Sequence, residues 1–180
     1  MTTALELIDR TIGKEGRYVN NKDDLGGETI WGITIAVARE NGYKGPMRDM
    51  PRSTAVDIYM KKYFVRTRFN AVLDIYPKLA EKLFDCGVNL GVSWPGIWLQ
   101  TALNAFNNKA AYYKDIAVDG AVGPGTLAAL VAYKAKRGAR GESVLLKAIN
   151  AQQGTRYLTI TQAREDNETF TYGWFDNRVD

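Results

Sequence analysis

Amphipathic helix patterns run through most of this 180-residue sequence, and they limit the fold classes open to it. Near the N-terminus, Thr3 and Glu6 have the three-residue spacing of a capping box, which satisfies free backbone amides at a helix start. Leu5, Ile8 and Ile12 recur at helical spacing, so we expect them to share one apolar stripe. A first helix is therefore predicted here, ended by the glycines that follow.

One segment, residues 17–32, departs from the helical pattern. It is rich in turn-forming residues, and the overlapping stretch ETIWGIT, residues 28–34, alternates weakly, which allows a short strand or hairpin. The rest of the chain returns to helical periodicity, broken mainly at glycines. The expected fold is therefore mainly α, with one small β-hairpin. Further helices are expected at residues 35–41, from Ser53 onward, and at residues 78–88, 96–108, 125–134 and 143–165.

The sequence contains no histidine, which removes several classes of enzyme. Nucleophilic Ser-His-Asp and Cys-His sites need an imidazole base, and the usual catalytic zinc sites need histidine ligands. Cys86 is the only cysteine, so no intrachain disulfide can form, and we expect an inert thiol in the core. Hydrolytic chemistry would therefore depend on carboxylates, with no metal or other cofactor.

Charge and the N-terminal sequence restrict the partners and the cellular location. A net charge of +4 and a pI near 9.1 favour an anionic partner such as cell-wall polymer, nucleic acid or a membrane surface. The densest basic cluster, residues 133–140, has no interleaved aromatic platform, so nucleic-acid binding is not expected. The sequence shows no signal peptide and no apolar run near the roughly 20 residues of a membrane span. We therefore expect synthesis in the cytosol without stable membrane insertion.

Glu15 is the first candidate for a catalytic group. It lies seven residues after Ile8, so in a continuous helix it would extend the apolar face. Burial there and the negative end of the helix would both raise the pKa of its carboxyl. A carboxyl that is protonated near neutral pH is what general-acid attack on a glycosidic oxygen requires. The alternative is that Glu15 lies past the helix end, in solvent beside Lys14.

Asp24 and Thr29 follow in the turn-rich segment and could complete an acid–base pair with Glu15. In inverting glycosidases the two carboxyls stand roughly 6.5 to 9.5 Å apart, with a water molecule between them. Asp24 would activate that water and Thr29 would position it, which predicts inversion at the anomeric carbon. The alternative is that Asp23 and Asp24 only form the turn ahead of the glycines. Glu28 could orient this loop, bind substrate or lie in solvent.

The segment EGRYVNNKDDLGGETIWGIT, residues 15–34, resembles the signature of glycoside hydrolase family 108. That signature starts with Glu-Gly-Gly-Tyr and continues through Asp-Pro-Gly-Gly-Glu-Thr to Trp/Tyr-Gly-Ile-Thr. The departures are Arg17 for the second glycine and Leu25 for the proline, and neither removes a catalytic group. The segments AVDIYMKKYF, residues 55–64, and LFDCGVNLG, residues 83–91, are also similar to segments of that family.

The resemblance implies a lysozyme-like α+β fold, mainly α, with the β-hairpin beside an active-site cleft. It implies an N-acetylmuramidase that cleaves the β-1,4 bond between N-acetylmuramic acid and N-acetylglucosamine, with Glu15 as the acid. Residues 1–94 would form this glycoside hydrolase region. Residues 95–180, with the patterns WLQTALNAF and VDGAVGPGTLAAL, resemble a helical peptidoglycan-binding-like region packed onto it. Within that region, Asp119 and Gly120 are expected to form a turn and build the fold rather than touch ligand.

Sugar faces stack on aromatic rings, so aromatic residues are candidates for substrate binding. The predicted aromatic contacts are Tyr18, Trp31 and Tyr63, and the predicted polar contacts are Glu28 and Asn89. Core packing is the alternative for Tyr63, which has helical spacing to another tyrosine. Asn89 could instead cap the helix that ends near it.

The expected partner is the glycan strand of peptidoglycan, bound by a monomer. Two other functions fit the same sequence: a lytic transglycosylase, which would use Glu15 alone, and a cell-wall binding module without activity. The family is common in bacteriophage endolysins and in secretion-associated muramidases, and of these we expect an endolysin. Such a protein would stay in the host cytoplasm after synthesis. It would act in the periplasm or cell wall after release through a membrane pore.

Overall fold

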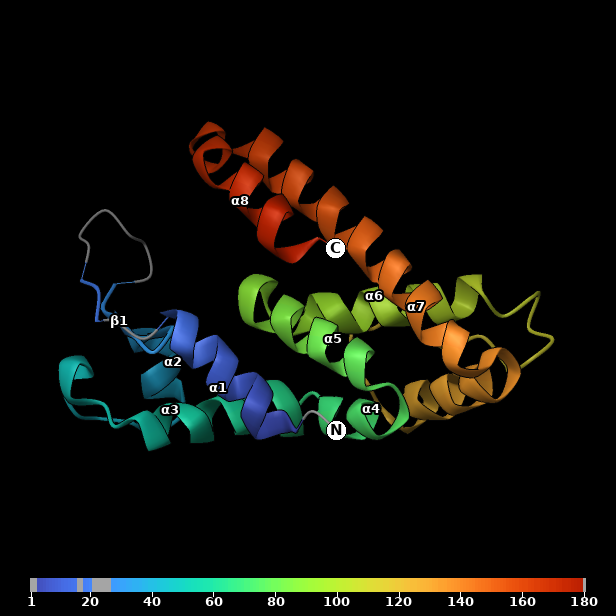
Figure 1. Cartoon of the computed structure of the whole chain (residues 1–180), viewed down its shortest axis with the longest axis horizontal. Helices are drawn as coiled ribbons and strands as arrows, with labels where there is room; N and C mark the ends of the chain where they lie inside the picture. The colour runs from blue at the N-terminus through green and yellow to red at the C-terminus, as the bar shows by residue number, and fades with distance from the viewer. Residues whose placement is uncertain (1–2, 16–17, 21–26, 180) are drawn as a thin grey trace. The chain divides into compact units, whose positions relative to one another are not determined.

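The chain folds into two compact units, Met1–Asn70 and Ala71–Asp180, in this computed structural model (Figure 1). The structure describes residues 3–15, 18–20 and 27–179. Helices dominate both units, and the sheet found among the described residues is a two-stranded hairpin in the first unit. The mainly α fold with a small hairpin is therefore confirmed. Of the helices in the described part of the chain, none has both the length and the apolar character of a membrane span.

The first unit combines short helices with the hairpin. Its elements are α1 (Ala4–Glu15), β1 (Thr29–Ile30), β2 (Ile33–Thr34), α2 (Ile35–Glu40), the 3₁₀ helix η1 (Met47–Asp49), α3 (Arg52–Tyr59) and the π-helix η2 (Met60–Val65). Helix α1 packs on α3 and η2, while β1 contacts η1. Helix α4 (Phe69–Ile75) spans the division between the units.

Helix α1 begins as predicted, but Gly13, the first of the two glycines expected to break it, lies inside the helix. The capping box is confirmed, because the Thr3 amide donates to Glu6 Oε2 at 2.8 Å and the Glu6 amide donates to Thr3 Oγ1 at 3.3 Å. The helix passes through Gly13 and ends at Glu15, since one helical glycine costs only about 1 kcal/mol. The predicted stripe is wrong at Leu5, which is 53% exposed. The buried apolar residues of α1 are Leu7, Ile8 and Ile12.

The predicted hairpin is confirmed over residues 29–34. Strands β1 and β2 are antiparallel, and the buried Ile30 and Ile33 face each other across the ladder. The connecting residues Trp31 and Gly32 have φ values of 56° and 73°. Two positive values in a two-residue loop are typical of a type I′ turn, whose twist matches that of the flanking strands.

The second unit is a group of helices in which α6 packs on both α5 and α7. Its elements are α5 (Pro77–Leu90), α6 (Ser93–Ala105), α7 (Pro124–Ala163), η3 (Glu165–Asn167) and α8 (Glu168–Arg178). The helices predicted at residues 125–134 and 143–165 are joined into α7, whose path breaks at Gly138 (φ 60°, ψ −154°). Helix α8 folds back beside the end of α7 (Figure 1), where the rings of Trp174 and Tyr157 stack with centroids 5.1 Å apart.

Buried Gln100 fixes the long connection between α6 and α7. Its Nε2 donates to Asp119 Oδ1 at 2.8 Å and to Thr126 Oγ1 at 3.2 Å. Its Oε1 accepts the backbone amides of Asp119 at 3.0 Å and Gly120 at 2.8 Å. The hydrogen bond from Gln100, followed by that from the Ala121 amide, holds the pKa of Asp119 below its usual range. Asp119 and Gly120 thus build the fold, as the sequence predicted.

Candidate active site

The predicted catalytic carboxylates lie at the edge of what the structure describes. Glu15 is the last residue of α1, so its backbone continues the helix that carries the buried Ile8 and Ile12. The side chain of Glu15, and all of Asp24, lie outside the described residues. Their roles as acid and base therefore stay predictions. The continuity of α1 through Glu15 is the backbone condition that the predicted acid requires.

Four of the other predicted site residues lie in the hairpin or next to it. One of them, Trp31, is part of the hairpin turn. The residue after Tyr18 pairs with Thr29 through two backbone hydrogen bonds of 2.8 Å. Thr29 is half-buried at the start of β1, and its Oγ1 donates to the carbonyl of Gly27 at 3.4 Å. Glu28 is also half-buried, and its carbonyl accepts a backbone hydrogen bond of 2.8 Å from the first residue of α2. Tyr18, Glu28, Thr29 and Trp31 thus share one small structural element.

Trp31 occupies a strained position at the tip of this hairpin. Its φ of 56° lies in the left-handed region, which is rare for bulky residues and costs about 1–3 kcal/mol. Its indole N–H donates to the carbonyl of Met50 at 2.9 Å, and its own carbonyl accepts the hydroxyl of Tyr59 at 3.1 Å. These bonds from distant parts of the chain fix the turn. Strain held in this way is common at ligand-binding sites, and the substrate contact of Trp31 stays a prediction.

Arg48 is a neighbour of Tyr18 that the sequence did not reveal. Its guanidinium carbon lies 5.0 Å from the centroid of the Tyr18 ring, within the range of a cation–π interaction. No local spacing rule links two residues this far apart in the sequence, so only the fold shows the contact. The exposed Arg48 places positive charge beside a ring that is a candidate for sugar stacking.

Tyr63 lies in the π-helix η2, a rare conformation that often marks functional sites. Its half-buried ring lies 5.5 Å from the ring of Tyr59, centroid to centroid, and Lys62 Nζ is 5.9 Å from its centroid. Burial raises the pKa of the Tyr63 hydroxyl, and the Glu40 carboxylate adds to the effect. Core packing accounts for Tyr59, which is 1% exposed, whereas Tyr63 stays partly accessible.

Asn89 does not cap its helix, so the capping alternative is wrong. Helix α5 runs on to Leu90, and Gly91 forms the cap with a φ of 94° and a 3.1 Å bond from its amide to the carbonyl of Gly87. The Oδ1 of Asn89 instead accepts the hydroxyl of Tyr157 at 2.8 Å. Asn89 therefore joins α5 to α7 within the second unit.

Groups that could bind a metal are dispersed. Within the ranges that the structure describes, no three Cys, Asp or Glu side chains gather into a set of ligands. Cys86 is fully buried, and burial raises the pKa of its thiol to about 12. The thiol is therefore protonated at neutral pH and inert, as predicted.

Two family models together span almost the whole chain. Residues 8–91 match the model described as glycosyl hydrolase 108. The N-terminal part of this chain belongs to the glycosyl hydrolase 108 family. Residues 94–179 match the model described as a predicted peptidoglycan domain. Both resemblances seen in the sequence are thus confirmed, and they make this protein a glycoside hydrolase that acts on peptidoglycan.

A solved structure, that of Brucella abortus SagA, is similar to this chain over most of its length. The match has 21% sequence identity and a TM-score of 0.68, and it covers 95% of this chain and 86% of that one. At this identity the likeness shows the fold alone. Among curated proteins the comparison finds no match.

The two family regions are joined through helix α5. The glycosyl hydrolase 108 match ends just after α5, whereas the compact second unit begins before it. Within this unit, α5 is bound to the peptidoglycan-domain region by Asn89 and Tyr157 and by an ion pair of 2.5 Å between Asp85 and Arg178. The peptidoglycan domain is therefore built onto a helix of the hydrolase region. The division expected after residue 94 stays a prediction.

Proposed function

We propose that this chain is an N-acetylmuramidase with lysozyme activity, which hydrolyses the β-1,4 bond between N-acetylmuramic acid and N-acetylglucosamine. The observation that carries the proposal is the glycosyl hydrolase 108 match over residues 8–91, which include Glu15, Asp24 and Thr29. The match over residues 94–179 supports peptidoglycan as the substrate. The continuous α1 and the constrained hairpin are the local structures on which such a site would rest.

In the proposed mechanism, Glu15 donates its proton to the glycosidic oxygen as the bond to the leaving sugar breaks. The C-terminal end of a helix carries partial negative charge, which raises the pKa of a carboxyl there and favours its protonated form. Asp24 accepts a proton from the attacking water, and the hydroxyl of Thr29 holds that water. Attack from the opposite face of the sugar inverts the configuration at the anomeric carbon.

The proposed substrate contacts follow from the chemistry of the side chains. Rings of Tyr18, Trp31 and Tyr63 present faces on which sugars stack. Glu28 and Asn89 provide polar contacts to hydroxyl and acetamido groups. We further propose that the protein acts as a monomeric phage endolysin, which reaches the cell wall through a membrane pore. Its net charge of +4 is suited to the anionic envelope of a target cell.

An assay on purified peptidoglycan distinguishes an enzyme from a binding module. The wild-type chain is expected to clear a suspension of peptidoglycan and to release soluble glycan fragments at a rate proportional to protein concentration. The measurement is the fall in turbidity together with the yield of soluble reducing ends. Sedimentation of the chain with peptidoglycan, without any release of fragments, would leave the binding module as the better account.

Asp24→Asn is expected to slow fragment release by about 10²-fold, because the variant cannot accept the proton of the attacking water. Asp23→Asn makes the same change of charge one residue earlier and is the matched control, with a rate close to that of the wild type. Initial rates of fragment release at fixed pH provide the comparison. An unchanged rate for Asp24→Asn would reduce Asp24 to a turn-forming residue.

A further inference from the structure

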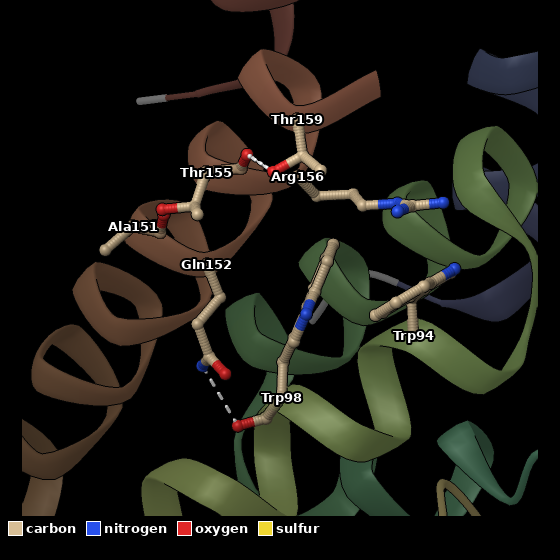
Figure 2. A pocket seen from close by; sticks show the side chains of 7 residues that line it. All are labelled: Trp94, Trp98, Ala151, Gln152, Thr155, Arg156 and Thr159. Atoms are coloured by element: carbon tan, nitrogen blue, oxygen red, sulfur yellow. Dashed lines mark hydrogen bonds between the residues drawn. The ribbon is translucent and has the colours of Figure 1, made fainter. Parts of the chain in front are cut away.

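A groove of about 420 Å³ lies between α6 and α7 in the second unit (Figure 2). Its volume falls in the range of about 300–1,000 Å³ that is typical of ligand sites. Helical i, i+4 spacing brings its side chains onto facing surfaces of the two helices. The residues that line it are Trp94, Trp98, Ala151, Gln152, Thr155, Arg156 and Thr159.

Two tryptophans form the aromatic wall of the groove. The rings of Trp94 and Trp98 lie 6.0 Å apart, centroid to centroid, with an angle of 37° between their planes. Trp98 is 4% exposed and belongs to the core, whereas Trp94 is half-buried. The ring of Trp94 is therefore partly accessible to a ligand, and Trp98 supports it from within.

Arg156 supplies the charge of the groove. Figure 2 shows it reaching from α7 over Trp94, and its guanidinium carbon lies 4.4 Å from the centroid of that ring. Its Nε is buried and has no hydrogen-bond partner among the residues that the structure describes. A planar guanidinium held in this way has donors available for a carboxylate.

Two threonines of α7 also line the groove. Thr155 Oγ1 donates to the carbonyl of Ala151 at 2.9 Å, and Thr159 Oγ1 donates to the carbonyl of Thr155 at 2.9 Å (Figure 2). Each hydroxyl proton is therefore used within α7, which leaves the oxygen as an acceptor. The groove thus combines one partly accessible aromatic ring and one cation with two threonines.

We propose that this groove is the site at which the peptidoglycan domain holds its polymer. An N-acetylated sugar packs against the part of the Trp94 ring that Arg156 leaves accessible, and a carboxylate of the attached peptide binds Arg156. Peptidoglycan carries the two groups next to each other, because its peptides are attached to the sugars. The proposal rests on the proposed peptidoglycan substrate and on the family match over residues 94–179, which names the domain but no residues.

The test uses the full chain with Glu15→Gln, so that the probe is not cleaved. A soluble disaccharide–tetrapeptide from peptidoglycan is titrated while the indole ¹⁵N–¹H signals of the four tryptophans are recorded. We expect saturable shifts of the Trp94 and Trp98 signals. Binding elsewhere, for example beside Trp31, would instead leave these two signals in place and would overturn the proposal.

Two variants test the carboxylate contact of Arg156 and the sugar contact of Trp94 separately. Arg156→Gln is expected to weaken the response of Trp94 and Trp98 to the disaccharide–tetrapeptide by about tenfold, because a charge-assisted hydrogen bond is lost. It should not weaken their response to oligomers of N-acetylglucosamine, which carry no carboxylate. Trp94→Ala should weaken binding of both probes, seen at the Trp98 signal. Equal binding by Arg156→Gln and the parent chain would overturn the assigned carboxylate contact.

Two control variants change residues of the second unit that lie outside the groove. Arg140→Gln removes a charge from an exposed position of α7, and Tyr172→Ala removes an aromatic ring that is 81% exposed. Both should bind the probes as the parent does, and thermal unfolding verifies that all variants are folded. A single-stranded oligonucleotide that shifts Trp94 and Trp98, when the disaccharide–tetrapeptide does not, would overturn the proposal in favour of nucleic acid.

Failure of the groove proposal can be distinguished from failure of the proposed muramidase activity. If the wild-type chain releases no fragments from peptidoglycan while Trp94 and Trp98 respond to the probe, the groove stands and the muramidase proposal fails. If the wild-type chain cleaves peptidoglycan while neither signal responds, the muramidase proposal stands and the groove is not the site.

Discussion

Replacing Glu15 by glutamine is expected to reduce the release of soluble fragments from peptidoglycan to background, a loss near the upper end of about 10²–10⁴-fold. Glutamine has nearly the same shape as glutamic acid but has no acidic proton to give to the glycosidic oxygen. The leaving sugar would then depart as an unprotonated alkoxide, which is a poor leaving group. Initial rates with purified peptidoglycan provide the measurement, and thermal unfolding should show that the variant folds normally.

Glu6→Gln is the matched control for this loss. Glu6 lies on the same helix and undergoes the same change of charge, and glutamine can still accept the hydrogen bond of the capping box. This control should retain wild-type activity. Normal turnover by Glu15→Gln would remove Glu15 from the mechanism, and with it the general-acid chemistry proposed for this chain.

Gly96→Ala is expected to destabilise the second unit by about 3 kcal/mol or more, the upper end for overpacking a close contact. A Cβ at this buried position of α6 would lie 2.0 Å from the carbonyl oxygen of Gly120 and 2.6 Å from its carbonyl carbon. These are backbone atoms, so either α6 or the turn must move. The turn is the one held by Gln100, whose hydrogen bonds would be broken by such a shift.

Gly125→Ala is the control for Gly96→Ala. A Cβ at this exposed position in the first turn of α7 meets no atom within 4 Å, so the change should be neutral or slightly stabilising. Thermal unfolding provides the comparison, and Gly96→Ala should lower the Tm by roughly 6–12 °C. Equal Tm values for the two variants would mean that the close approach of Gly96 to Gly120 does not stabilise the unit.

Local signals predicted those parts of the fold that depend on neighbours in sequence. The capping box of Thr3 and Glu6 forms as its spacing indicates, and Trp31 and Gly32 form the turn of the predicted hairpin. Gly91 ends α5 because its φ of 94° suits a residue without a Cβ. Each of these features is decided within a few residues, so periodicity and turn chemistry are sufficient to find it.

Features that depend on packing were not predictable in this way. Helical spacing placed Leu5 on the buried stripe, but the packing of α1 against its neighbours buries Leu7 instead. Tyr157 binds Asn89 across 68 residues of sequence, and no local rule relates the two. The same holds for Arg156 and Trp94 in the groove, although the i, i+4 spacing of Trp94 and Trp98 is a signal that sequence analysis could have used.

The most direct test of the proposed reaction is mass spectrometry of the fragments released from purified peptidoglycan in H₂¹⁸O. Hydrolysis adds one water at every cleaved bond, so each new N-acetylmuramic acid end should be reducing and carry one ¹⁸O atom. A lytic transglycosylase would leave 1,6-anhydro ends without added water, and cleavage of the other glycosidic bond would leave reducing N-acetylglucosamine. Either of these products as the main species would contradict the muramidase proposed here.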